Sequence, residues 1–439
     1  MADDRRWNRR SLLRGAAVVA GAAATVPLLG EAATALAGSG EAATALVGSG
    51  DADALFRAGK FEQAGRAYEE ILRKDPDNVH AARRRGYVGL LSNRFPDAEK
   101  YLKTALKLAP DDKDANGLLA DCYTRQDEFP LAAPHWRAAG EESYAKLFAA
   151  FRGEPYRIHG DIARVRWQQM DPMPLLEASL NGGPPISLSF YTRVGQLAVS
   201  QKAAKQAGLV AVTVDKFEYQ GRTMTYWSGI LDSFKLGGIE LRNIPVAWSD
   251  AQDDPGSGDG MIGTWILYHF LTTIDYAGRS LILRPRTPET ARKARAAAER
   301  SGAEPLPLWL AHEHLLFSRG SVAGSGERVV ALNIGGTGEM AAGMTEETAR
   351  RLRIRTDYDR PVETSAGGRF LTAYPCYPRE VRLGNAAAND VYCYAGGPGA
   401  PAREGFDVLA HFSHSFYKPY NVTLDFTDMR VYIARGEAA

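Results

Sequence analysis

The chain has 439 residues, of which 45% are apolar and 24% charged, a globular composition long enough for two or three domains. This composition excludes a wholly disordered chain, a collagen-like fibre and a disulfide-dense miniprotein. The 53 Lys and Arg residues balance the 52 Asp and Glu residues, so the chain lacks the basic excess of proteins that track nucleic-acid phosphates. We therefore expect no nucleic-acid partner.

The first 37 residues have the pattern of an export signal. The run NRRSLLR contains the pair Arg9-Arg10 and precedes an Ala- and Gly-rich apolar stretch that ends at Gly30. This segment resembles a twin-arginine signal, in which a receptor reads the arginine pair. The resemblance implies export to the periplasm, the cell envelope or the extracellular space. No other apolar run approaches 18 residues, so we expect no stable membrane span.

Residues 38–50 predict a low-complexity linker, because most of them belong to a decapeptide that is written twice, EAATALAGSG and EAATALVGSG.

Residues 51–150 have a helical apolar pattern with a period of 34 residues. The markers that recur at this spacing are Phe61, Phe95 and Phe129, then Ala64, Ala98 and Ala132, with Pro76 and Pro110 closing the first two units. The pattern resembles the tetratricopeptide repeat, a helical array that commonly binds peptides or partner proteins. Pro130 and Pro134 lie where a helix of the third unit would continue, so that unit is either degraded or the place where the array docks. We expect a docking scaffold with a protein partner.

The remaining chain changes to short apolar strands punctuated by Gly, Pro and Asn, which indicates β structure. We predict one β domain over 155–287, a helical linker over 288–305 and a second β domain over 306–436. The two halves follow the same order: a strand leading to a turn and short helix, a Leu-Gly turn between strands, and a closing hairpin. With an offset of 145 residues, Ser200 falls on Thr345 at the start of the short helix.

Residues 156–436 resemble the retropepsin-like aspartic proteases, in the form where two homologous lobes lie on one chain. The resemblance depends on the repeated order of elements and on the segment GMIGTWIL, followed by IDY, before the closing hairpin. It implies a fold class of α-helical tetratricopeptide-like repeats followed by two all-β pepsin- or retropepsin-like lobes. In that family each lobe supplies an Asp-Thr-Gly turn, and the two aspartates meet between the lobes.

The chain lacks both of these aspartates. The resemblance places the first turn on Tyr191, Thr192 and Arg193 and the second on Gly336, Thr337 and Gly338, and no Asp-Thr-Gly or Asp-Ser-Gly occurs anywhere. Peptide hydrolysis by this family requires two carboxylates that share one proton, one acting as base and the other as acid. A glycine has no side chain for this task, and a tyrosine with a pKa near 10 is a poor base at neutral pH.

Three hypotheses for the cleft follow. The first is a non-proteolytic binding groove for a peptide or small ligand, with Thr192 and Thr337 bracing the two turns. The second is a repurposed enzyme in which Tyr191 acts as acid, Arg193 as anion clamp and Glu339 as base. The third is a closed cleft in which Arg193 and Glu339 form a structural ion pair. Active peptide hydrolysis by acids recruited from elsewhere is a further alternative, for which no motif is visible.

The hairpins that cover the cleft in the family fall near residues 219–227 and 364–374. Tyr226 and Trp227 are aromatic donors that could contact a ligand or pack on their own lobe.

Other candidate sites find less support in the sequence. His312 and His314 lie on one face of an expected strand, but no third metal ligand follows, so we expect neither metal nor cofactor. His411 and His414 flank an aromatic run and are expected in the core. Cys376 and Cys393 lie in neighbouring expected strands and could form a disulfide in an oxidising compartment.

Overall fold

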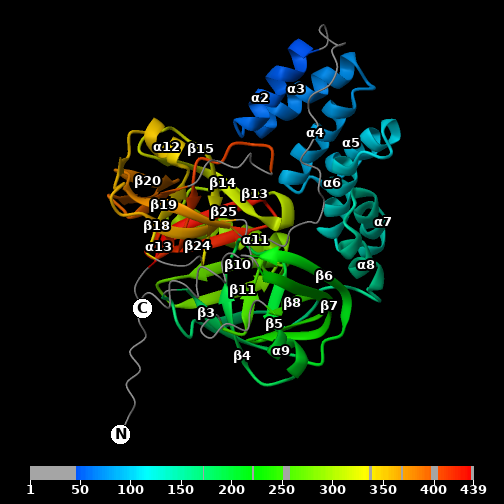
Figure 1. The fold of residues 1–439 in the computed structure, drawn as a ribbon, viewed down its shortest axis with the longest axis vertical. Coiled ribbons are helices and arrows are strands. Elements are labelled where there is room, and N and C mark those ends of the chain that lie inside the picture. The colour runs from blue at the N-terminus through cyan, green and yellow to red at the C-terminus, as the bar shows by residue number, and fades with distance from the viewer. Residues whose placement is uncertain are drawn as a thin grey trace.

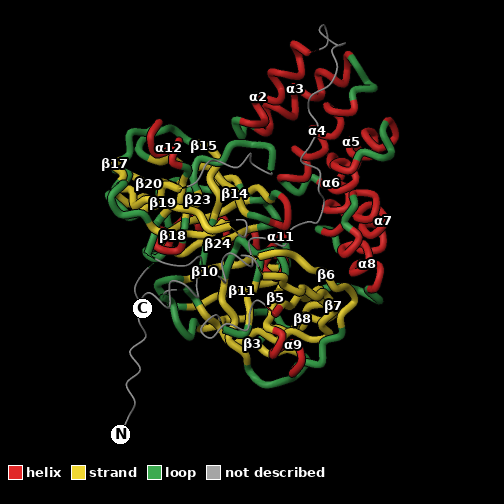
Figure 2. The backbone as a smooth tube through the Cα atoms, in the orientation of Figure 1, coloured by secondary structure: helices red, strands yellow, loops and turns green. Residues whose placement is uncertain are grey.

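The computed structural model describes residues 46–171, 173–219, 222–250, 258–335, 339–366, 369–396 and 404–436. An array of helices lies along one side of a larger β-rich body (Figures 1 and 2). The expected signal at 1–37 lies outside the described residues. None of the helices in the described ranges has the length and apolarity needed to cross a membrane.

Within the described residues the N-terminal part consists of seven helices. They are α2 (Leu46–Arg57), α3 (Phe61–Lys74), α4 (Val79–Leu91), α5 (Phe95–Leu108), α6 (Lys113–Thr124), α7 (Phe129–Ala139) and α8 (Glu142–Ala150). The 34-residue period is confirmed, because the three repeated phenylalanines begin α3, α5 and α7. Helix α7 continues past Pro134, so the third unit keeps its helix; Pro130 lies in the first turn, where the missing N–H leaves no bond unmade.

Small residues and polar caps explain why these helices form and pack. Ala64, Ala98 and Ala132 are fully buried, and a Cβ on Gly89 would lie 2.9 Å from the backbone nitrogen of Ala98, so the helices approach closely. The side chain of Asn78 accepts a hydrogen bond from Ala81 N at the start of α4. The Pro76 turn before this cap separates α3 from α4.

Two β lobes follow the helices. Lobe 1 contains β1 (Arg157–His159), β2 (Ala163–Arg166), β3 (Leu175–Leu180), β4 (Ile186–Phe190), β5 (Leu197–Ser200), α9 (Gln201–Gln206), β6 (Ala211–Tyr219), β7 (Arg222–Leu236), β8 (Ile239–Ser249), β9 (Gly260–Ile262), α10 (Thr264–Leu267), β10 (Phe270–Asp275) and β11 (Ser280–Pro285). Helix α11 (Pro288–Arg300) is the predicted linker helix, capped by Thr287.

Lobe 2 repeats this order. It contains β12 (Leu306–Pro307), β13 (Trp309–Leu310), the 3₁₀ turn η2 (His312–His314), β14 (Leu316–Val322), β15 (Arg328–Leu332), β16 (Ala342–Met344), α12 (Glu346–Arg351), β17 (Arg355–Thr356), β18 (Val362–Ala366), β19 (Arg369–Tyr377), β20 (Glu380–Leu383), β21 (Ala386–Asn389), β22 (Cys393–Gly396), β23 (His411–Phe412), α13 (His414–Tyr417), β24 (Tyr420–Asp425) and β25 (Arg430–Arg435).

A six-stranded sheet joins the two lobes. Its order is β12-β25-β24-β10-β11-β2, so three strands come from each lobe and β10 pairs with β24 at the centre. The hydroxyls of Thr273 and Thr423 meet across this central pair at 2.9 Å. The closing hairpin of lobe 1 recurs in lobe 2 at an offset of 150 residues: its first strand begins at Phe270 and at Tyr420, and its second strand at Ser280 and at Arg430. The sheet therefore relates the lobes by an approximate two-fold axis.

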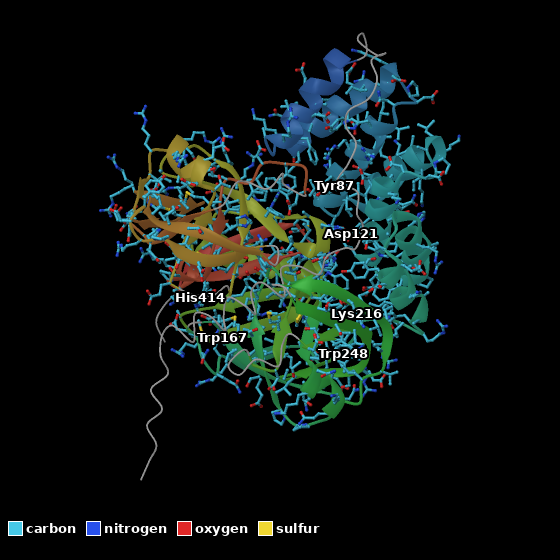
Figure 3. The ribbon with its side chains drawn as sticks, in the orientation of Figure 1. Tyr87, Asp121, Trp167, Lys216, Trp248 and His414 are labelled. Carbon is cyan, nitrogen blue, oxygen red and sulfur yellow. The ribbon has the colours of Figure 1, made fainter. Side chains whose placement is uncertain are left out.

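The helical array docks on both lobes through buried contacts. The guanidinium of Arg125 is fully buried, donates to the carbonyl oxygens of Leu310 at 3.2 Å and Ala311 at 3.1 Å, and pairs with Asp121 (labelled in Figure 3). The ring of Phe61 packs edge-on against Trp309, with 4.9 Å between the ring centroids. The array and the β lobes thus share a core.

The prediction of a strand at His312–His314 was wrong, because these residues form a 3₁₀ turn in which Glu313 has a φ of 56°.

Cys376 and Cys393 lie directly opposite each other in β19 and β22, and both are buried free thiols. Burial raises the pKa of the Cys376 thiol to about 12.

Candidate functional site

Two turns, one from each lobe, meet at the lobe junction. Strand β4 ends in the turn Tyr191-Thr192-Arg193, and β15 ends in the turn Asn333-Ile334-Gly335. The hydroxyl of Thr192 donates to Leu332 O at 2.7 Å and accepts from Ile334 N at 2.9 Å. The backbone N–H of Thr192 also donates to Ile334 O at 3.0 Å. This fully buried threonine therefore ties the two turns together.

The same strand arrangement supports each turn. Strand β9 runs parallel to β4, and Ile262 O at its end accepts from Tyr191 N at 3.3 Å. Strand β23 runs parallel to β15, and Phe412 O at its end accepts from Asn333 N at 2.7 Å. Ile262 and Phe412 are separated by the 150-residue offset of the closing hairpins. Tyr191 and Asn333 therefore occupy equivalent positions in the two lobes.

The turn of lobe 2 that meets Thr192 begins at Asn333, three residues before the turn that the sequence analysis predicted, which begins at Gly336. Gly336, Thr337 and Gly338 lie outside the described residues, so the expected brace by Thr337 is not tested. Gly335 ends the observed turn with a φ of 83°, and a Cβ there would lie 2.1 Å from Phe190 O in the other lobe. Only glycine fits this close approach.

The phenol of Tyr191 lies in a small apolar cluster. Its side chain packs with Met173, Val194 and Met261, and the residue is 7% exposed. Burial raises the pKa of Tyr191, while the charge of Arg193 and a hydrogen bond from the Asn333 side chain act in the opposite direction. Tyr191 therefore stays protonated at neutral pH.

Asn333 has a polar atom that its described surroundings leave unsatisfied. The residue is 7% exposed, and its Oδ1 is buried without a hydrogen-bond partner among the described residues. A buried amide oxygen without a partner costs about 1–3 kcal/mol. Neither of the two equivalent positions at the lobe junction has a carboxylate.

Arg193 reaches the other lobe. Its Nη1 donates to His411 Nδ1 at 2.7 Å, and because a guanidinium can only donate, the neutral imidazole must carry its proton on Nε2. Burial and the adjacent Arg193 charge lower the pKa of His411 to about 3. Glu339 is exposed and makes no ion pair with Arg193 in the described part of the chain, so the expected Arg193–Glu339 pair is replaced by an Arg193–His411 contact.

Tyr226 and Trp227 lie on β7 in the long β6–β7 hairpin. Tyr226 is half-buried, and its pKa is raised by burial and by the negative charges of Glu313 and Asp215. Trp227 stacks on Trp248 of its own lobe at 6.4 Å. The neighbours of Tyr226 and Trp227 therefore lie toward η2 and within lobe 1, and no contact among the described residues joins them to Tyr191.

The hairpin is also fixed to the helical array. The hydroxyl of Ser143 in α8 donates to Asp215 Oδ1 in β6 at 2.8 Å. The helices thus help to set the position of a hairpin that flanks lobe 1.

The described residues contain no group of three or more His, Cys, Asp or Glu side chains that could hold a metal ion. His314 is buried, and burial lowers its pKa well below the usual range. His414 is fully buried, in agreement with the expected core position, and its Nδ1 is hydrogen-bonded to the Tyr276 hydroxyl at 3.3 Å.

The sequence reasoning missed Asn333, Gly335 and His411 as members of this site. A signal was present, because Leu332-Asn333-Ile334-Gly335 matches an apolar-Asp-Thr-Gly pattern as well as Phe190-Tyr191-Thr192-Arg193 does. The glycine-rich run that follows Asn333 offers several registers, and only the contacts with Thr192 distinguish them.

Comparison with known proteins identifies the helical part. The tetratricopeptide repeat family model matches residues 49–103 and 90–146. Residues 49–146 are therefore tetratricopeptide repeats, an architecture that suggests a protein-interaction role. No curated protein matches the chain.

Proposed function

We propose that this chain is an exported, non-proteolytic binding protein whose β lobes have the retropepsin-like architecture and whose repeats hold a protein partner. The observation that carries the proposal is the pair Tyr191 and Asn333, which take equivalent positions in two turns tied together by Thr192. Function has to be argued from these side chains, because a fold supports many activities.

The side chains at the junction do not support water activation. An asparagine amide does not titrate, and the raised pKa of Tyr191 keeps its phenol neutral over the range in which proteases work. General acid–base assistance contributes roughly 10²–10⁴-fold per group, so the loss of both acids removes the family reaction.

The same side chains support binding. The half-buried guanidinium of Arg193 and the unsatisfied Oδ1 of Asn333 offer a donor and an acceptor within one junction. A peptide backbone presents the complementary carbonyl and N–H groups, and its hydrogen bonds would satisfy the buried amide. The alternative of a repurposed enzyme has less support, because its intended base Glu339 is exposed and forms no described contact with Tyr191 or Arg193.

The first test is peptide hydrolysis by the full chain. We expect no cleavage of an unfolded substrate protein between pH 3 and 7.5, as read by mass spectrometry of the products. Cleavage that an active-site inhibitor of aspartic proteases suppresses would overturn the proposal.

The second test is ligand retention. Native mass spectrometry of the purified chain should reveal a bound peptide or small molecule that an Arg193→Ala variant loses. A Lys202→Gln variant is the matched control, because it removes one exposed charge from α9 in the same lobe. Equal ligand content in all three proteins, or none in any, would contradict a binding role for the junction.

A further inference from the structure

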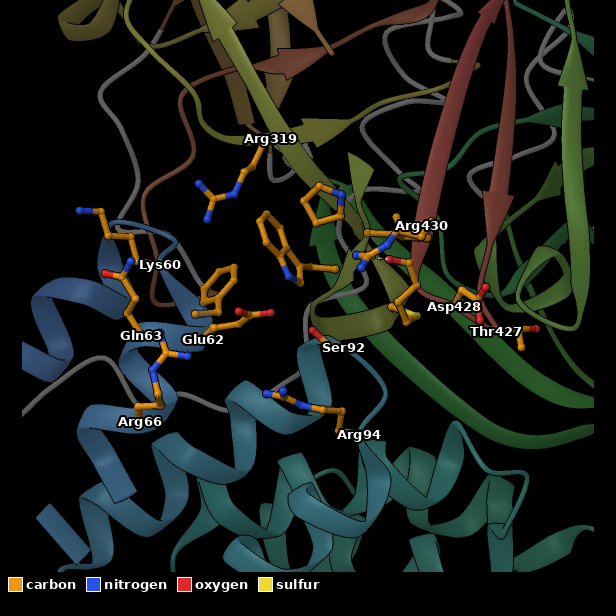
Figure 4. A pocket seen from close by; sticks show the side chains of 15 residues that line it. Lys60, Glu62, Gln63, Arg66, Ser92, Arg94, Arg319, Thr427, Asp428 and Arg430 are labelled. Carbon is orange, nitrogen blue, oxygen red and sulfur yellow. Dashed lines mark hydrogen bonds between the residues drawn. The ribbon is translucent and has the colours of Figure 1, made fainter. Parts of the chain in front are cut away.

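A second candidate binding site lies between the helical array and lobe 2. A cavity of about 530 Å³ separates the first helical repeat from lobe 2 (Figure 4). Helix α3 and the α4–α5 turn form one wall, and β12 to β14 with the β24–β25 hairpin form the other. A volume of roughly 300–1,000 Å³ is typical of ligand sites.

The lining of this cavity is strongly cationic. Five basic side chains face it: Lys60, Arg66, Arg94, Arg319 and Arg430. Two carboxylates accompany them, and that of Asp428 is already paired with Arg295, which lies outside the lining. Glu62 is the remaining acid. Because the whole chain is nearly neutral, this positive charge is a local feature.

Most of these cations have no ion-pair partner within the described ranges. Arg94 has Asp97 at 3.8 Å, and Arg319 donates to Gly59 O at 3.4 Å, but Lys60, Arg66 and Arg430 form no ion pair with a described residue. Like charges gathered without counter-charges repel one another, and an anionic ligand would relieve that repulsion.

The cavity also has an apolar wall. Phe61, Leu308 and Trp309 line it and are buried, and the guanidinium of Arg319 lies 5.5 Å from the Trp309 ring centroid. Figure 4 shows the labelled side chains of Arg319, Arg66 and Arg430 on different sides of the cavity. A small inorganic anion would contact the cations but not the exposed edge of this wall, where Trp309 is 7% exposed.

We propose that this cleft binds an acidic peptide segment, with carboxylates that face the arginines and an apolar side chain that packs beside Trp309. The charge pattern selects the acidic side chains, and the apolar wall selects a peptide over a simple polyanion. The inference identifies a site where a partner protein would contact both the repeats and lobe 2. It does not depend on the function of the Tyr191–Asn333 junction.

The test measures fluorescence anisotropy of a labelled decapeptide that alternates Glu and Ala around a central Phe, at about 50 mM salt. We expect the full chain to bind it, and binding should weaken as salt screens the charges. A peptide with Gln in place of each Glu should bind at least tenfold more weakly. An Arg66→Gln/Arg430→Gln variant should lose about 5- to 20-fold in affinity, as expected for two partly exposed ion pairs.

The matched control is Arg73→Gln/Lys74→Gln, which removes two exposed charges from the same helix α3 outside the cavity. It should change the affinity less than twofold, and Arg193→Ala should bind the peptide as the wild type does. Equal binding of the Gln peptide, an equal loss in the control variant, or binding of inorganic polyphosphate without binding of the peptide would each overturn the proposal.

Discussion

The hydroxyl of Thr192 offers a direct test of how the lobes are joined. A Thr192→Val substitution keeps the shape of the side chain and removes the bonds to Leu332 O at 2.7 Å and from Ile334 N at 2.9 Å. Both backbone groups would then lose a partner in a fully buried place, since Thr192 has no exposed surface. The loss of these two hydrogen bonds, which leaves two buried backbone groups unsatisfied, predicts a loss of about 2–4 kcal/mol in the free energy of unfolding.

The matched control is Thr273→Val, which removes another hydroxyl contact between the lobes. Thr273 meets Thr423 at 2.9 Å, but both residues are only partly buried, so water can replace the contact. We expect a loss of about 0–1 kcal/mol for the control, measured for both variants by urea unfolding followed by tryptophan fluorescence. Equal losses in the two variants would refute the view that the Thr192 turn is the main polar tie.

Three further perturbations probe the docking, the histidine and the missing acids. Arg125→Leu should lower the free energy of unfolding by about 3–5 kcal/mol, as measured by urea unfolding. The substitution leaves the buried carboxylate of Asp121 unpaired and removes the donor that two carbonyl oxygens of lobe 2 share. The pKa of His411 is lowered to about 3 in the folded chain. As the pH falls below about 6.5, the imidazole is therefore protonated in the unfolded chain but not in the folded chain, and the free energy of unfolding decreases. His411→Gln should therefore reduce the stability difference between pH 6.5 and 4.5 by about 2 kcal/mol, and an unchanged difference would show that this imidazole does not stay neutral. Tyr191→Asp/Asn333→Asp should remain inactive toward unfolded substrates, whereas adding Arg193→Gly should give measurable cleavage; an active double variant would contradict the role assigned to Arg193.

The sequence predicts the helical part well because its signals are local. The small residues at helix contacts and the capping Asn78 act within one or two turns of helix, and the 34-residue period repeats these local signals from one helix pair to the next. The one deviation is the third unit, where Pro134 stays inside α7. Packing against neighbouring helices compensates for the single backbone hydrogen bond that the proline removes.

The order of elements in the two lobes was also predictable, but the register of the second turn was not. Along the chain the offset between equivalent positions is 145 at the short helices and 150 at the closing hairpins. From Tyr191 to Asn333 it is 142. Insertions in the loops between strands change the offset, and loop length has little effect on local patterns. The contact between Thr192 and Ile334 is long-range, so no local signal specifies it.

The most informative departure from two-fold symmetry is the third position of each turn. Gly335 has a positive φ and lies against Phe190 O, whereas the equivalent Arg193 has no such φ and sends its side chain to His411 in the other lobe. A cation fixed beside the junction would stabilise the ionised form of any acid placed there, so two carboxylates introduced at these positions could not share a proton near neutral pH. The two turns therefore differ in backbone and in electrostatics as well as in the residues at their equivalent first positions. This difference supports the proposal that the junction binds polar groups and does not transfer protons.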